Sequence, residues 1–180
     1  MRVFAYCTEE ARVAVARATG VQPLTSPPMT AIEFESNWLE GYDVLYFRLH
    51  GKRGIPGWYG DGVAGEPAAL FSVHILSARL QGATVVVANC YGADSDPMVD
   101  ALYRAGAGYV IAGPGKNKAL GRKVVGPDLL VQWMLRVLRA GWSAPVALAV
   151  ARMRLVLTAV RESDADALGF KVIPKKEWNR

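Results

Sequence analysis

The chain has 180 residues, of which 52% are hydrophobic and 21% are charged, so it can form a core and is neither disordered nor collagen-like. We therefore expect one domain over residues 1–180. No apolar run approaches the ~18 residues that cross a bilayer, and Glu9 and Glu10 interrupt the first run, so we expect neither a membrane span nor a signal peptide. The net charge is +5, but the basic clusters lack interleaved aromatic residues, so neither a nucleic-acid nor a membrane partner is expected.

The chain contains two cysteines, Cys7 and Cys90, which are too few for a disulfide framework. No CxxC or HxxxH spacing marks a metal site, and the glycine clusters do not match a phosphate-binding GxxxxGK[ST] loop. The sequence thus predicts a cytoplasmic chain with reduced thiols, no metal and no cofactor.

Apolar runs and amphipathic runs alternate along the chain. In its first part we expect strands at 2–6, 31–34, 43–49 and 83–89, and helices at 8–20 and 67–82. The six glycines between Gly51 and Gly65 predict a loop or a small hairpin. After residue 95 we expect helices at 96–106, 127–141 and 145–160, strands at 109–112 and 170–173, and a basic loop at 113–126.

Three local signals carry most of these expectations. The segment 43–49 is nearly continuous in β-forming residues, as is typical of a strand buried on both faces. Pro67 suits the first position of a helix, and Asp96 followed by Pro97 is a helix-capping pair. The alternation predicts an α/β fold, with a mostly parallel central sheet and helices on both faces, whose sites lie at the carboxyl ends of strands.

Two reactive residues follow two of these strands. His50 comes directly after the strand at 43–49, and Cys90 directly after the strand at 83–89. The segment between them suits a crossover that returns the chain to a neighbouring parallel strand, ~4.8 Å away. A nearby imidazolium favours the thiolate form of a cysteine, and the same histidine can protonate a departing amine. The N–H groups of Gly51 and Cys90 could together hold an oxyanion.

These segments resemble caspase-like cysteine peptidases of clan CD, and most closely their bacterial branch, the CHAT domains. The similarity lies in a strand followed by His-Gly (Leu45–Gly51), a strand followed by Cys (Val85–Gly92), and the stretches 105–113 and 147–152. It covers about residues 41 to 155 in consistent order.

The resemblance implies a caspase-like three-layer sandwich, His50 as general acid and base, Cys90 as nucleophile, and no metal. The chain departs from the family in having Tyr91 where an acidic residue often follows the cysteine, and it carries no helical repeats. The expected function is a cysteine endopeptidase acting on a protein or peptide substrate, with any targeting or activation supplied by a separate protein or by the chain's own loops.

The side chain before the cleaved bond usually sets the specificity of such enzymes. Asp61, Asp94 and Asp96 could line that pocket and favour a basic residue, although Asp96 also suits a helix cap. The opposite preference, for an acidic residue, would follow if the pocket were lined instead by the basic residues Lys116, Lys118, Arg122 and Lys123. Two other functions stay open: a catalytically inactive caspase-like module that binds a protein partner, and a binder of a small anionic ligand.

Overall fold

The computed structural model describes residues 1–60, 67–94, 96–115, 125–158 and 165–175. Its centre is a six-stranded sheet with the strand order β2-β1-β3-β7-β8-β9. The strands are β1 (Val3–Thr8), β2 (Leu24–Ser26), β3 (Val44–Arg48), β7 (Thr84–Val87), β8 (Tyr109–Ala112) and β9 (Lys171–Val172). All neighbours pair in parallel except β9, which is antiparallel to β8. The predicted α/β class with a mostly parallel sheet is confirmed.

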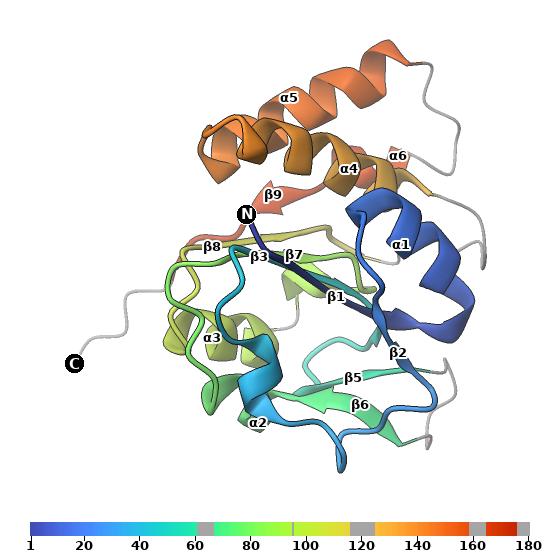
Figure 1. Cartoon of the computed structure of the whole chain (residues 1–180), viewed down its shortest axis with the longest axis vertical. Coiled ribbons are helices and arrows are strands. Elements are labelled where there is room, and N and C mark those ends of the chain that lie inside the picture. The colour runs from blue at the N-terminus through green and yellow to red at the C-terminus, as the bar shows by residue number, and fades with distance from the viewer. Residues whose placement is uncertain (61–66, 95, 116–124, 159–164, 176–180) are drawn as a thin grey trace.

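A second, antiparallel sheet begins shortly after the end of β3. It contains β4 (His50–Gly51), β5 (Gly57–Tyr59) and β6 (Ala68–Phe71), in the order β4-β5-β6. The short helix α2 (Ser72–Leu76) follows directly and leads back toward the central sheet (Figure 1). The described part of the glycine-rich segment, residues 51–60, thus contributes two strands to a small sheet beside the carboxyl end of β3.

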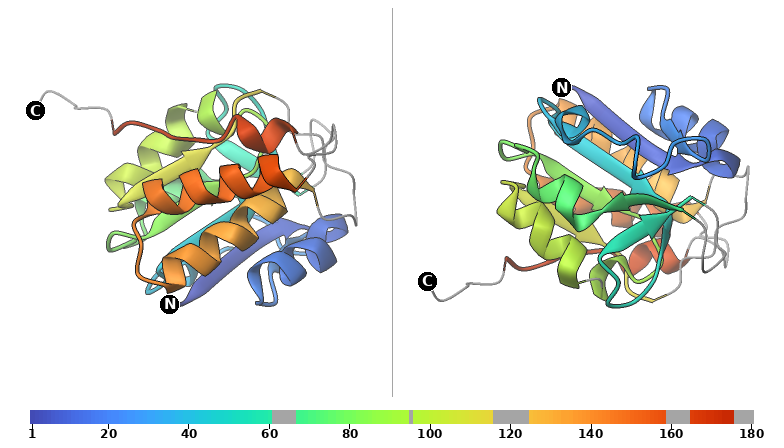
Figure 2. Two further views of the ribbon diagram at one scale, coloured as in Figure 1. Left: turned by 90° about the horizontal axis from the view of Figure 1, so that it is seen from above. Right: turned by 90° about the horizontal axis from the view of Figure 1, so that it is seen from below.

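Helices cover both faces of the central sheet, which gives three layers (Figures 1 and 2). One face carries η1 (Glu9–Ala11), α1 (Arg12–Thr19), α4 (Gly126–Arg139), α5 (Ala144–Leu157) and α6 (Ala165–Leu168). The other carries η2 (Ser36–Leu39), α2 and α3 (Asp96–Arg104), together with the small sheet. The turn η3 (Gly92–Asp94) joins β7 to α3.

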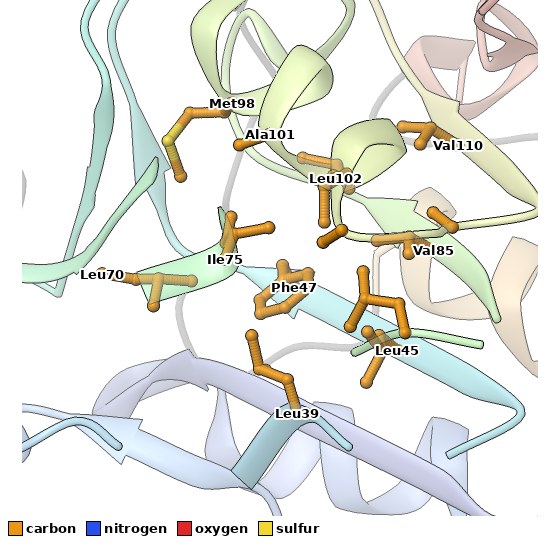
Figure 3. Close-up of a cluster of buried hydrophobic side chains, with 14 of the residues drawn as sticks. Leu39, Leu45, Phe47, Leu70, Ile75, Val85, Met98, Ala101, Leu102 and Val110 are labelled. Atoms are coloured by element: carbon orange, nitrogen blue, oxygen red, sulfur yellow. The ribbon is translucent and has the colours of Figure 1, made fainter. Parts of the chain in front are cut away.

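Alternating side chains of β3 divide the core between the two faces. Leu45 and Phe47 pack toward α2 and α3, among the residues drawn in Figure 3. Val44 and Tyr46 pack toward α4 and α5 instead. All five residues of β3 are buried, which confirms that this strand is covered on both sides.

Two expectations from the sequence are wrong. Residues 31–33 form a turn rather than a strand, and Ala31 donates its N–H to the carbonyl of Ala68 at 2.7 Å, whereas β2 lies earlier, at Leu24–Ser26. The segment expected to be a helix from 67 to 82 begins as strand β6 and is helical only over Ser72–Leu76. Pairing of β6 with β5 supplies backbone hydrogen bonds that outweigh the helical spacing of its apolar residues. Within the described ranges, no helix is long and apolar enough to cross a membrane.

Candidate active site

The predicted catalytic residues lie at the carboxyl ends of two neighbouring strands. β3 and β7 pair in parallel, with Phe47 opposite Val87, and the N–H of Ala88 donates to the carbonyl of Phe47 at 2.8 Å. If that register continues for three residues, His50 stands opposite Cys90. Both residues are half buried. The crossover from β3 returns the chain to a neighbouring parallel strand, β7, as the sequence predicted.

Gly51 brings the two segments into direct contact. A Cβ atom built on Gly51 would lie 2.2 Å from the carbonyl oxygen of Cys90 and 3.3 Å from Cβ of Asn89. No real side chain tolerates the first of these distances, because the opposing atom belongs to the backbone. Glycine is required here for the close approach of the His50–Gly51 strand to the Cys90 backbone.

Asn89 ties the same two segments together by a hydrogen bond. Its side chain is fully buried, and its Oδ1 accepts the backbone N–H of Leu49 at 2.7 Å. A buried side-chain amide that satisfies a buried backbone donor fixes the spacing of the chain on both sides. This role of Asn89 was not predicted from the sequence, although a polar residue at the end of an apolar strand, directly before Cys90, is a signal for it.

Cys90 lies in a tight and strained turn. The N–H of Gly92 donates to the carbonyl of Asn89 at 3.1 Å, and Tyr91 has a left-handed φ of 56°. That conformation is unfavourable for a tyrosine and more typical of glycine. A second bond, from the N–H of Tyr91 to the carbonyl of Gly115 at 2.5 Å, holds the turn against the loop after β8.

Of the three predicted specificity residues, the structure fully describes only Asp94. Asp94 ends η3, is half buried, and donates its N–H to the carbonyl of Tyr91 at 2.9 Å. It therefore lies one turn away from Cys90. Asp96 begins α3, but its side chain lies outside the described part of the structure, as does the whole of Asp61. The basic residues at 116–123 also fall outside it.

The aromatic residues after His50 anchor the small sheet. Trp58 pairs with Gly51 across β4 and β5, is almost fully buried, and has its ring centroid 4.8 Å from that of Phe47. Tyr59 pairs with His50 and is half buried. The Nδ1 atom of His74 accepts the N–H of Phe71 at 3.1 Å. The packing of Trp58 thus holds the strand that carries His50.

A buried polar network lies on the α4 side of the sheet, two residues before His50. A guanidinium nitrogen of Arg48 is 2.5 Å from Oδ2 of Asp128, and the hydroxyl of Tyr46 donates to Oδ1 at 2.8 Å. The N–H of Val125 also donates to this carboxylate, at 3.1 Å. Burial raises the pKa of Asp128, and the charge of Arg48 opposes that shift. Because the partners are 80 positions apart in the sequence, their pairing had no local signal.

The second cysteine has a different environment. Cys7 pairs with Arg48 across β1 and β3 and is completely buried. Burial raises the pKa of its thiol to about 12, and the nearby Arg48 only partly opposes this. Cys7 therefore stays protonated and unreactive at neutral pH.

No protein-family model matches this chain, and no curated protein is significantly similar to it. Within the ranges that the structure describes, no group of three or more His, Cys, Asp or Glu side chains could hold a metal ion.

Proposed function

We propose that the chain is a caspase-like cysteine endopeptidase in which Cys90 is the nucleophile and His50 is the general acid and base. The observation that carries this proposal is the contact of the His50–Gly51 segment with the backbone of Cys90, at the carboxyl ends of adjacent parallel strands. The three-layer arrangement agrees with the fold that the resemblance implies.

The pairing of the two strands is a first support. β3 and β7 are adjacent and parallel, so the segments that carry His50 and Cys90 leave the central sheet at the same end. The strained turn at Tyr91 is a second support, because unfavourable backbone conformations persist where a site needs a residue held in one position.

The first half of the reaction is acyl transfer to sulfur. His50 takes the proton of the Cys90 thiol, and the thiolate attacks the carbonyl carbon of the peptide bond. The N–H groups of Gly51 and Cys90 are the candidates to stabilise the oxyanion that forms. The carbon–nitrogen bond then breaks, and His50 gives its proton to the leaving amine, which leaves a thioester on Cys90.

The second half is hydrolysis of that thioester. Neutral His50 takes a proton from water, and the resulting hydroxide attacks the thioester carbonyl. The carbon–sulfur bond breaks, a carboxylic acid is released, and the proton returns from His50 to the sulfur. This cycle requires only the two side chains, the oxyanion donors and water.

We also propose a preference for a basic residue before the cleaved bond. Asp94 is the described carboxylate nearest to Cys90 in the chain and is fixed to the turn by its own backbone N–H. A carboxylate in that position would pair with an arginine or a lysine of the substrate. Asp61 and Asp96 are further candidates for the same pocket.

The test is a peptide-library digest with the native chain and three variants. Replacement of the nucleophile, Cys90→Ala, should abolish cleavage, by about a thousandfold or more, and His50→Ala should do nearly the same. The matched control is Cys7→Ala, which removes the buried thiol and should keep the activity. Circular dichroism on each variant confirms that it is folded.

The same experiment separates peptidase from partner-binding module. If no site in the library is cut in a Cys90-dependent manner while all variants are folded, the proposal is wrong and the inactive interaction module is favoured. Iodoacetamide labelling adds an independent readout: the labelling rate of Cys90 at mildly acidic pH should fall in His50→Ala if the two groups are coupled.

A further inference from the structure

The outer side of α5 is an exposed apolar surface. This helix lies beside α4 on the outside of the molecule (Figures 1 and 2). Its large exposed hydrophobic side chains, with the tryptophan that precedes it, are Trp142 (60% exposed), Val146 (38%), Met153 (61%), Val156 (60%) and Leu157 (71%). A contiguous group of such residues on a helix is unusual unless something binds there.

The spacing shows that these side chains form one stripe. Met153 comes seven positions after Val146 and three before Val156, so these residues recur on one side of the helix. The buried side, which includes Ala147, Ala151 and Leu155, lies opposite. Since α5 already packs against the sheet and α4 by that side, the exposed stripe is a second apolar face of the same helix.

The exposed charges of the α4–α5 segment have a single sign. Within residues 126–158, all of which the structure describes, the one acidic residue is Asp128, and it is fully buried and paired with Arg48. Four arginines of the same segment are exposed: Arg136, Arg139, Arg152 and Arg154. At 100° per residue, Arg152 and Arg154 project along opposite margins of the stripe.

Two of these arginines pack against the same aromatic ring. The guanidinium carbon of Arg136 lies 4.4 Å from the centroid of Trp133, and that of Arg154 lies 5.2 Å from the same centroid. These cation–π contacts hold both positive groups at the α4–α5 surface, where acidic side chains of a partner would pair with them.

We propose that the outer face of α5 binds an amphipathic helix of a partner protein, with apolar residues along one side and Asp or Glu at the margins. Residues three to four positions apart on both helices would interdigitate, and marginal acidic residues would pair with Arg152 and Arg154. A second copy of this chain is a poorer occupant, because it would bring the same positive margins together. The proposal goes beyond the peptidase reaction and does not depend on it.

The test uses two designed peptides of about 20 residues that differ only in marginal charge. Both are helical with leucine along one side; one carries glutamate at the margins and the other lysine. Fluorescence anisotropy of labelled peptides is measured against the full chain. The glutamate peptide should bind at least about tenfold more tightly than the lysine peptide.

Variants then tie the binding to this face. Met153→Gln with Val156→Gln should weaken binding of the glutamate peptide at least about tenfold, since it removes apolar contact without touching the core. Arg152→Glu with Arg154→Glu should reverse the preference, so that the lysine peptide binds better. The control Arg17→Glu with Arg79→Glu changes the net charge equally at exposed sites elsewhere and should leave the preference unchanged.

Several outcomes would overturn the proposal. These are failure of both peptides to bind, equal affinity for both, or no reversal in the double arginine variant. Binding to phosphatidylglycerol vesicles that needs Met153 and Val156, with no peptide binding, would assign the face to a membrane surface. Self-association in analytical ultracentrifugation that the Met153/Val156 variant abolishes would assign it to a second copy. Loss of Cys90-dependent peptidase activity is a separate measurement and decides only the catalytic proposal.

Discussion

Both cysteines of this protein lie near the carboxyl end of a parallel strand, but their surroundings differ. Cys7 lies near the carboxyl end of β1, and Cys90 lies just after the carboxyl end of β7, in the same parallel sheet. Cys7 is completely buried beside the Arg48–Asp128 pair, and burial raises its pKa. Cys90 is half buried in a strained turn in contact with Gly51.

The comparison shows that a position at a strand end is not enough to make a thiol available. β1 continues through Cys7 to Thr8 and then enters the helical segment η1–α1, so the thiol stays within the packed layer. β7 ends before Ala88, and the chain turns sharply around Cys90, which is half buried. The packing around each strand end decides how far each cysteine is shielded from solvent.

The largest expected difference is in alkylation. In the folded protein at neutral pH, iodoacetamide should label Cys90 at least about a hundredfold faster than Cys7, because Cys7 reacts only when the structure opens. Peptide mapping by mass spectrometry measures both rates in one sample. Comparable labelling rates of the two cysteines in the folded protein would contradict the difference in protection. As the control, both cysteines should be labelled at equal rates in denaturant.

The next largest effect should come from the ion pair beside Cys7. Asp128→Asn leaves the charge of Arg48 buried without its counterion and should lower the free energy of unfolding by about 3–5 kcal/mol. Urea denaturation measures the loss, and labelling of Cys7 should accelerate with it. In the control, Arg48→Met with Asp128→Leu removes both charges and should recover much of the stability; a loss below about 1 kcal/mol in the single variant would contradict the argument.

A smaller effect should come from the contact beside Cys90. Gly51→Ala forces the backbones of β4 and Cys90 apart and should cost about 1–3 kcal/mol of stability, together with most of the peptidase activity. Gly108→Ala is a matched control, since its Cβ would meet the carbonyl of Gly82 at 2.5 Å, at the opposite end of the sheet. The site is supported if both variants lose similar stability but only Gly51→Ala loses activity. Equal activity in Gly51→Ala and Gly108→Ala would count against it.

The smallest effect should be on the pH dependence of stability. Because the folded state raises the pKa of Cys7 from 9.0 to about 12, its contribution is complete below pH 9 and is lost as the pH rises toward 12. Between about pH 8 and pH 10, the free energy of unfolding of the native chain should therefore fall by about 1 kcal/mol relative to that of Cys7→Ala. Urea denaturation at both pH values measures this difference, and a difference independent of pH would show that Cys7 is not protected.

The sequence by itself determined the elements whose local signals agree with their tertiary surroundings. The strands β3, β7 and β8 follow from continuous apolar runs, and α3 follows from the capping pair of Asp96 and Pro97. The placement of His50 and Cys90 after two such strands predicted that both lie at the carboxyl ends of β3 and β7, where the structure has them. A parallel crossover then brings the two segments together with no further information.

Only the tertiary structure decided the features that depend on partners distant in the chain. Ala68–Phe71 is a strand because β5 lies beside it, although its apolar spacing suited a helix. The bond from Leu49 to Asn89, the contact of Gly51 with Cys90 and the pairing of Arg48 with Asp128 join residues about 40 to 80 positions apart. Local patterns report which face of an element is apolar, whereas burial, close approach and pairing arise only when separate elements pack together.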